Sequence, residues 1–268
     1  MLKIDDKPMS SAIPSQKENM IEYSQHESDV FGISFGRISM EENFSNWTAV
    51  QNEIATSDYK YIRAKIKKPT NTDIDNLKSL GKSAHLLEIV KSYTTEKLNT
   101  YQVVSICDDY VYVKVQESTK ELFFEMFNET YEDIPFGSYT PAVLIEQFSI
   151  SLQKKSLSSY FYSYYDGSCP EKESYLIYNK QENLVGCLTI DFFETETYSY
   201  YVGIKKEFRK NDILLKTINF IHLVTQKRNL LYAKGSARLH NVYSQKAFDK
   251  SGMKCTGYDW IFLIEVNH

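Results

Sequence analysis

The sequence predicts an α/β fold of the mixed-sheet (α+β) type, and three observations support this class. Runs of β-branched and aromatic residues alternate with amphipathic helical segments along the chain. Residues 101–268 follow the order β-α-α-β-β-β-α-β-α-β, and a shorter unit upstream also mixes strands with helices. The composition, 42% hydrophobic and 25% charged, is that of a globular protein. We therefore expect a complete C-terminal domain preceded by a smaller lobe.

The N-terminal part of the chain is predicted to contain a polar arm, residues 1–25, and an α/β lobe, residues 26–100. Few aliphatic residues occur in the arm, so we expect it to be held loosely. The elements expected in the lobe are a turn leading into a strand at 27–38, a helix at 47–57, a strand at 59–67, a helix at 73–80 and a strand at 86–93.

The C-terminal domain, residues 101–268, is predicted to be richer in strands. A polar turn at 179–183 separates two apolar runs, which indicates a hairpin. The other elements expected are strands at 103–106 and 110–115, helices at 118–131 and 141–156, an aromatic run at 160–165, a strand at 200–204, a helix at 211–228, an apolar run at 230–233, a short helix ending near 251–253 and a strand at 259–266.

Charge and cysteine usage exclude several classes of protein. The net charge of −4 argues against a nucleic-acid partner, since such proteins are usually basic. The four cysteines lie far apart without a C-x-x-C pair, so neither a zinc site nor a disulfide framework is expected. No apolar run approaches the roughly 18 residues of a membrane span, and the N-terminus lacks the apolar run of a signal peptide. We expect a cytoplasmic protein with no metal and no membrane partner.

Residues 198–253 contain the stretch in which chemistry is expected. A strand at 200–204 leads into a basic turn and then into the helix at 211–228. The backbone N–H groups at a helix N-terminus can bind an anion. The cations of the turn are Lys205, Lys206, Arg209 and Lys210. The sequence therefore predicts an anion site at the start of this helix.

Two patterns in this stretch, together with the order of elements from about 109 to 266, resemble the GNAT acyltransferase superfamily. Arg209-Lys210-Asn211-Asp212-Ile213-Leu214 is similar to the R/Q-x-x-G-x-G/A turn that holds the pyrophosphate of acyl-CoA. A later pattern, N-x-x-A-x-x-x-Y-x-x-x-G-F, has as its counterparts Asn241, Ser244, Phe248, Gly252 and Met253.

The resemblance implies acetyl-CoA, or another acyl-CoA, as co-substrate. It implies that the backbone of Ile204 and Lys206 aligns the pantetheine, and that residues 209–214 hold the pyrophosphate. Asn241 would contact the pantetheine or the pyrophosphate, or else it caps the helix that begins after it.

The turn departs from the family pattern at two positions. Asp212 replaces the first Gly and Leu214 replaces the Gly/Ala. At an effective dielectric near 20, two like charges ~5 Å apart repel by roughly 3 kcal/mol, on the order of a hundredfold in affinity. The Asp212 side chain could also cap the N–H groups that an anion would use. The nearby cations oppose this repulsion.

The later pattern departs at Phe248, because the family tyrosine there protonates the leaving thiolate and phenylalanine has no hydroxyl. Tyr243 is the nearest tyrosine in sequence and a candidate, although five helical residues place it about 140° around the helix from Phe248. His240 is a candidate base or an ordinary surface histidine.

Carboxylates at the end of the strand at 185–193 are candidates for the base that deprotonates an amine acceptor. They are Asp191, Glu194 and Glu196, of which we take Glu194 as the candidate catalytic residue; the alternative is that all are solvated strand-end acids. The aromatic side chains at 160–165 would stack on a sugar or a nucleotide base of a ligand, or else pack in the hydrophobic core.

The expected function is an acyl-CoA-dependent N-acyltransferase for a small amine. Residues 27–38 resemble the beginning of two-lobed GNAT proteins that acylate nucleotide-linked amino sugars, such as TDP-fucosamine acetyltransferase. This implies a GNAT-like C-terminal domain behind a smaller, degenerate GNAT-like lobe. The alternatives are a GNAT-fold binding or scaffold module without catalysis, and an enzyme that uses a different acyl or nucleotide donor.

Overall fold

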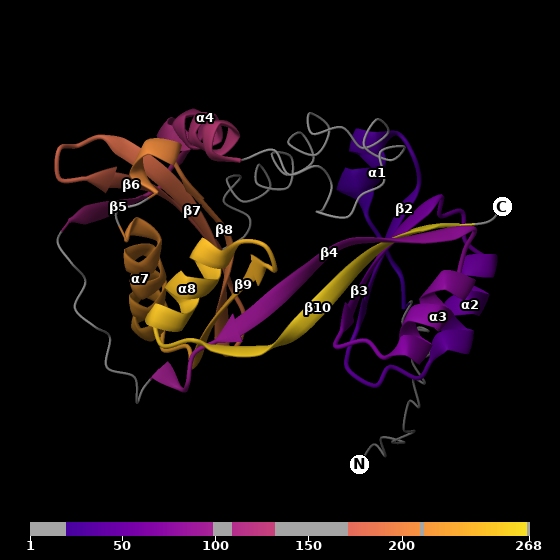
Figure 1. Cartoon of the computed structure of the whole chain (residues 1–268). Coiled ribbons are helices and arrows are strands. Elements are labelled where there is room, and N and C mark those ends of the chain that lie inside the picture. The colour runs from indigo at the N-terminus through magenta and orange to yellow at the C-terminus, as the bar shows by residue number, and fades with distance from the viewer. Residues whose placement is uncertain (1–19, 99–108, 132–170, 210–211, 267–268) are drawn as a thin grey trace, which may run out of the picture.

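The computed structural model describes residues 20–98, 109–131, 171–209 and 212–266. Their elements confirm the predicted mixed α/β class (Figure 1). The predicted segments at 103–106, 141–156 and 160–165 lie outside the described residues.

The described strands form one mixed sheet in the order β1-β2-β3-β10-β4-β9-β8-β7-β6-β5 (Figure 1). Its neighbours β2–β3 and β8–β9 run parallel, and its other neighbours run antiparallel. The strands are β1 (Glu22–Tyr23), β2 (Phe35–Met40), β3 (Tyr61–Lys67), β4 (Ser83–Thr94), β5 (Tyr110–Lys114), β6 (Lys172–Asn179), β7 (Leu184–Phe192), β8 (Glu196–Ile204), β9 (Tyr232–Arg238) and β10 (Lys254–Glu265).

Helices cover both faces of this sheet. They are α1 (Gln25–Phe31), α2 (Trp47–Ala55), α3 (Asn71–Ser79), α4 (Lys120–Thr130), α7 (Ile213–Lys227) and α8 (Val242–Lys250), with short 3-10 turns η2 (Glu117–Thr119) and η3 (Lys206–Phe208). The figure separates α1 and α4, at the top of the view, from α2, α3, α7 and α8 (Figure 1). None of these helices is both long and apolar enough to cross a membrane.

The first predicted element needs a correction. Residues 27–38 were expected to form a turn and a strand, but α1 occupies the first part and the strand begins only at Phe35. Gly32 ends the helix in the left-handed conformation, with φ of 68°, which glycine adopts without steric cost. The buried Glu27 carboxylate then joins α1 to the sheet through Arg37 at 2.7 Å and Arg63 at 3.0 Å. This ion pairing connects residues distant in sequence, so local patterning could not reveal it.

The two halves of the molecule repeat one order of elements. The N-terminal half contains β2-α2-β3-α3-β4, and the C-terminal half contains β8-α7-β9-α8-β10. In each half a helix connects the two strands of the parallel pair, as parallel pairing requires. The last strands of the halves, β4 and β10, lie side by side in the centre of the sheet.

The central strands β4 and β10 join the halves into one sheet. Asp259–Glu265 pairs with β3 on one side, and β10 pairs along its length with β4 on the other. The segment Val90–Thr94 of β4 then pairs with β9 of the C-terminal half. The boundary expected near residue 100 remains a prediction, and β10 contributes to the N-terminal half of the sheet.

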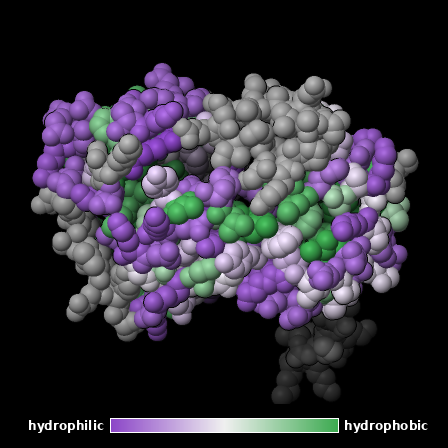
Figure 2. Space-filling view, viewed as in Figure 1, coloured by the Kyte–Doolittle hydropathy of each residue, from purple (hydrophilic) through white to green (hydrophobic). Residues whose placement is uncertain are grey.

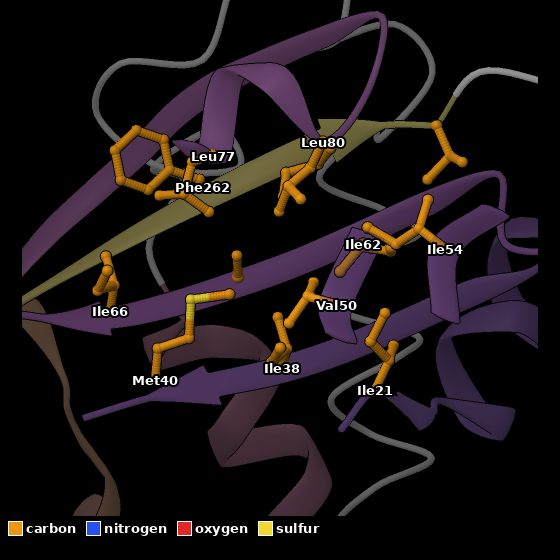
Figure 3. Close-up of a cluster of buried hydrophobic side chains, with 13 residues drawn as sticks. Ile21, Ile38, Met40, Val50, Ile54, Ile62, Ile66, Leu77, Leu80 and Phe262 are labelled. Carbon is orange, nitrogen blue, oxygen red and sulfur yellow. The ribbon is translucent and has the colours of Figure 1, made fainter. Parts of the chain in front are cut away.

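Each half has its own hydrophobic core. In the N-terminal half, α2 and α3 bury aliphatic side chains against β2, β3 and β10; the labelled members in Figure 3 are Ile21, Ile38, Met40, Val50, Ile54, Ile62, Ile66, Leu77, Leu80 and Phe262. On the side shown in Figure 2, hydrophobic residues also gather at the surface in a band across the middle of the molecule.

The C-terminal half buries side chains on both faces of its strands. Leu188 and Ile190 of β7 pack in the cluster that contains Ile213 and Ile221 of α7, whereas Cys187 packs in the cluster of α4. Alternate residues of a strand point to opposite faces. We call these two sides the α7 face and the α4 face; Thr189 and Asp191 follow Cys187 on the α4 face.

Candidate functional site

The parallel strands β8 and β9 separate part of the way along. They pair at three positions, the last of which joins Tyr198 to Lys234. Beyond that point β8 remains paired with β7, and β9 remains paired with β4. Each strand therefore turns one edge of backbone N–H and C=O groups toward the diverging space, where a ligand can bind them. We call the point of separation, at Tyr198 and Lys234, the fork.

A β-bulge lies immediately beyond the fork. The register of β7 and β8 shifts between Thr189 and Ile190, so that Tyr200 is the extra residue on β8. A bulge bends its strand and increases its local twist. The bulge therefore explains why β8 leaves β9 at this place.

The equivalent strands of the N-terminal half do not separate. There β2 and β3 pair in parallel at every position from Phe35↔Tyr61 to Met40↔Ile66. Of the two parallel pairs in the described structure, only β8–β9 stops pairing before its strands end. The N-terminal half thus repeats the order of elements without the opening.

Side chains close around the fork on both faces of the sheet. On the α4 face, the hydroxyls of Tyr198 and Ser236 share a hydrogen bond of 2.9 Å that bridges the two strands. On the α7 face, a Cβ added to Gly235 would meet Ser199 Oγ at 2.8 Å and the Phe248 ring at 2.9 Å. Glycine is thus required at 235 by the close approach of these groups.

Phe248 is a core residue. Its side chain is 6% exposed and stacks on Tyr93 of β4, with ring centroids 4.8 Å apart. Tyr243 is 85% exposed, which confirms that the two residues face different sides of α8. The Tyr243 hydroxyl therefore lies away from Phe248 and from the fork.

The predicted anion turn follows the C-terminal end of β8. Arg209 Nε donates to the carbonyl of Ile204 at 2.9 Å, and this bond folds the turn back on the strand. Lys205 pairs with Glu129 of α4 at 3.1 Å, while the Lys206 and Arg209 side chains are exposed. Lys210 and Asn211 lie outside the described residues.

Asp212 does not cap α7 with its side chain. The residue adopts a left-handed conformation, with φ of 49°, and its carboxylate accepts no hydrogen bond from the first turn of the helix. It lies instead 3.8 Å from Lys250 Nζ. Of the two effects considered for Asp212, capping of the helix by its side chain is absent. Position 212 has the conformation that glycine adopts most easily.

Some of the remaining residues of the predicted donor site pack in the core, and the others lie at the surface. Ile213 is fully buried, and Leu214 packs against the cores below α7 and α8. Asn241 Oδ1 accepts from the backbone N–H of Ser244 at 3.1 Å, so the capping alternative holds for this residue. His240 is exposed beside it.

The three acidic candidates for the acceptor side differ sharply in environment. Glu194 is exposed in the turn between β7 and β8, and Glu196 pairs with Lys234 at 2.5 Å. Asp191 alone is buried. Burial raises the pKa of the Asp191 carboxyl, and the Lys172 ammonium opposes that rise. The sequence identified Asp191 as a candidate but did not distinguish it from Glu194 and Glu196. The face of the sheet on which a residue lies, and the element that covers that face, depend on the tertiary structure.

Ser174 and Thr189 lie on the same face as Asp191 and were not singled out from the sequence. The available signal was a hydroxyl residue inside each of two otherwise apolar runs, 174–178 and 184–190. Among the described residues, no group of three or more His, Cys, Asp or Glu is placed to hold a metal ion.

No family model and no curated protein matches the chain. Solved structures do match. A functionally unknown conserved protein from Staphylococcus epidermidis aligns with a TM-score of 0.60 at 12% identity, over 94% of each chain. A tandem GNAT protein from the clavulanic acid biosynthesis pathway aligns with a TM-score of 0.51 at 10% identity, over 81% of this chain and 67% of that one. A GCN5-related N-acetyltransferase from Kribbella flavida aligns with a TM-score of 0.51 at 11% identity, over 88% and 82%.

Proposed function

We propose that this chain, whose fold is that of the GNAT acetyltransferases, is an acyl-CoA-dependent N-acyltransferase that acts on a small amine. The observation that carries the proposal is the fork of β8 and β9, after which the chain passes through η3 to the N-terminus of α7. A fold alone does not establish an activity, and the fork is the feature of this chain that favours one.

The donor would bind along β8 beyond the fork, on the side that β9 leaves. From Tyr198 to Ile204 the strand covers about 20 Å, at roughly 3.3 Å per residue, which suits the extended amide chain of pantetheine. Its amides would pair with the strand edge, and its thioester would lie at the fork. The pyrophosphate would lie at the start of α7, where the helix N-terminus and the exposed side chains of Lys206 and Arg209 favour an anion.

The reaction would be a direct attack of the amine on the thioester carbonyl. Positioning of the two substrates and hydrogen bonds to the developing oxyanion would supply most of the rate. A nucleotide-linked amino sugar is the acceptor that we propose, on the strength of the resemblance to two-lobed GNAT proteins.

A second function, a binding module without catalysis, is favoured by one observation at the fork. Phe248 has no hydroxyl to protonate a thiolate and is committed to packing on Tyr93. In such a module the GNAT fold would present a surface or bind CoA without turnover.

Calorimetry with acetyl-CoA and with free CoA distinguishes these functions. The enzyme is expected to bind both ligands, because the pantetheine and pyrophosphate contacts are common to them, and to release CoA only when an amine is present. Absence of binding at millimolar CoA would contradict the donor site. Binding without transfer to any of a panel of amines would favour the module.

The Lys206→Ala variant tests the pyrophosphate end of the site. We expect CoA affinity to fall by roughly tenfold, since a charge-assisted contact to phosphate is lost. Lys227→Ala is the matched control, because Lys227 is an exposed lysine at the opposite end of α7. Equal affinities of the two variants would place the phosphates elsewhere.

A further inference from the structure

An open groove lies over the central strands β4 and β10, where the two halves of the molecule meet. Its volume is about 370 Å³. In Figure 1, β4 and β10 pass between α3 on one side and α8 on the other, and the hydrophobic band of Figure 2 crosses the same part of the view. We call this hollow the central groove. The residues that line it are Lys68, Pro69, Ile89, Leu239, Tyr258 and Trp260.

The floor of the central groove is formed by the two central strands. Trp260 of β10 is the register partner of Ile89 of β4, and Tyr258 is the register partner of Lys91. Residues two positions apart in a strand share a face of the sheet, so these four side chains point to the same side. Trp260 packs against the core below α2 and α3, which identifies that side as the one on which these helices lie.

The walls of the central groove are equivalent loops of the two halves. Lys68 and Pro69 follow β3, Leu239 follows β9, and these two strands have the same place in the repeated order of elements. One backbone hydrogen bond of 2.8 Å attaches each loop to a central strand. Lys68 N–H donates to the Tyr258 carbonyl, and Leu239 N–H donates to the Ile89 carbonyl. The groove is therefore formed before a ligand binds, which lowers the entropic cost of binding.

Apolar side chains are gathered at the central groove. Tyr258 is 40% exposed and Leu239 is 37% exposed, while Pro69, Ile89 and Trp260 are half-buried. Single exposed apolar residues are common on protein surfaces, whereas contiguous ones in a hollow mark a binding site. The volume of the groove lies within the range of roughly 300–1,000 Å³ that is usual for small-molecule sites. The groove therefore suits a small organic ligand.

A cation stands beside this apolar surface without an acidic partner in the described parts of the chain. Lys91 Nζ lies 5.7 Å from the centre of the Tyr258 ring, and no described carboxylate forms an ion pair with it. Lys68 Nζ, in contrast, pairs with Glu42 at 3.1 Å. The central groove thus combines two aromatic rings with one ammonium group that is available to an anion.

We propose that the central groove binds a small aromatic carboxylate, with its ring on Trp260 and Tyr258 and its carboxylate on Lys91. Aromatic side chains favour stacked or edge-to-face contacts with another ring, and an ammonium forms a charge-assisted hydrogen bond with a carboxylate. In the sheet, β9 lies between β4 and β8, so this ligand binds apart from the donor site proposed along β8. The site does not depend on acyl transfer, and its tests need no acyl-CoA.

Tryptophan fluorescence of the full chain tests the site, because the chain has only two tryptophans and the other one, Trp47, begins α2. Titration with 3-phenylpropionate should change the emission of wild type and of Trp47→Phe, and leave that of Trp260→Phe unchanged. NMR titration of wild type should shift the backbone amides of Ile89 and Tyr258. Neither signal changing at millimolar ligand, or emission changing in Trp260→Phe as in wild type, would overturn the site.

The Lys91→Met variant tests the carboxylate contact, because methionine removes the ammonium and keeps an apolar chain. Its affinity for 3-phenylpropionate should fall by about tenfold. The neutral 3-phenylpropanamide should bind wild type and Lys91→Met equally. Lys78→Met, at an exposed lysine of α3, is the matched control and should bind the acid as wild type does. Equal acid affinities of Lys91→Met and Lys78→Met would overturn the role of Lys91.

Two further comparisons test the apolar part of the groove. Leu239→Ala should weaken binding of 3-phenylpropionate by roughly threefold to tenfold, and Leu122→Ala, at a leucine of nearly equal exposure on α4, should leave it unchanged. Hexanoate, an aliphatic acid of similar length, should bind wild type roughly threefold to tenfold more weakly than 3-phenylpropionate. Equal binding of the two acids would overturn the aromatic class of ligand.

Dilution of the protein without ligand distinguishes a ligand site from an interface. The emission of Trp260 in Trp47→Phe should not depend on protein concentration. A shift of this emission on dilution would show that a second copy of the chain covers the central groove, and would overturn the proposal.

Discussion

Asp212 shows how one residue combines a backbone requirement with an electrostatic one. Its left-handed φ of 49° explains why the family pattern has glycine at this place. Its carboxylate is largely exposed and only 3.8 Å from Lys250. Solvent and Lys250 therefore screen the repulsion of a bound phosphate, which should lower affinity by less than the roughly hundredfold expected for two isolated like charges at an effective dielectric near 20.

Asp212→Gly is expected to tighten CoA binding by about tenfold, as measured by calorimetry. Asp212→Asn separates the two causes, because asparagine removes the charge but tolerates the left-handed conformation. If charge is the cause, both variants tighten binding equally; if the backbone is the cause, only the glycine variant does so. Unchanged or weaker affinity in both would show that Asp212 does not face the phosphates.

His222 is a fully buried residue of α7, and burial lowers its pKa from 6.5 to about 4. The native state therefore keeps it neutral, while the unfolded chain takes up a proton below pH 6.5. Folding stability should fall by about 3 kcal/mol as the pH drops from 6.5 to about 4. His222→Leu should lose this part of the pH dependence in urea unfolding, and His240→Gln, at an exposed histidine, should keep it. If the free energy of unfolding of His222→Leu depended on pH as in wild type, the lowered pKa of His222 would be contradicted.

At the scale of elements, the buried Glu27 carboxylate is one of the contacts that hold α1 against the sheet, beside the bond from Phe35 N–H to Ser28 Oγ. Burial alone would raise the pKa of Glu27, but the charges of Arg63 and Arg37, with a hydrogen bond from Arg37, lower it to about 2. A group with a lowered pKa stabilises the fold above its unfolded value, here 4.5, and loses that effect as the pH falls toward 2. The contribution of Glu27 is thus complete at neutral pH.

Glu27→Gln should lower the free energy of unfolding by about 2–3 kcal/mol at neutral pH, at or just below the roughly 3–5 kcal/mol of a broken fully buried ion pair, since both arginines are partly solvated. The difference from wild type should shrink as the pH falls below 4.5. Amide hydrogen exchange should show the loss first in α1. Asp29→Asn, on the exposed side of the same helix, is the control, and equal effects of the two variants would contradict this account.

For the whole molecule, the central pair β4–β10 makes the two halves one folding unit. The final strand of the C-terminal half lies between β3 and β4, and the final strand of the N-terminal half lies between β10 and β9. Neither half can complete its sheet without a strand from the other. We therefore expect both halves to unfold in one cooperative transition.

Leu263→Ala tests this coupling, because Leu263 is fully buried on β10 against the N-terminal half. Removing its side chain should lower the free energy of unfolding by about 2–5 kcal/mol. NMR signals of α2 and of the β6–β7 hairpin should disappear together, at a lower urea concentration than in wild type. Leu122→Ala, at an exposed leucine of α4, should leave the midpoint unchanged. A hairpin that keeps the wild-type midpoint would show that the halves unfold separately.

Much of this fold followed from the sequence alone. The hairpin of β6 and β7, the helices α2, α3, α4, α7 and α8, and the strand that precedes α7 were predicted because period, turn residues and caps are properties of neighbouring residues. Asn241 was correctly considered as a cap for the same reason. The order of these elements was also enough to predict the GNAT architecture that the solved structures show.

Only the tertiary structure decided which residues meet. Three features depend on strand order, register and face, which bring together residues far apart in the chain. They are the buried role of Glu27, the fork at Tyr198 and Lys234, and the burial of Ser174, Thr189 and Asp191 on one face of the sheet. The same limit applies to Asp191 and Glu194, which are three positions apart and equally acidic in sequence. Burial separates them, because the free energy of a charge depends on its surroundings in space.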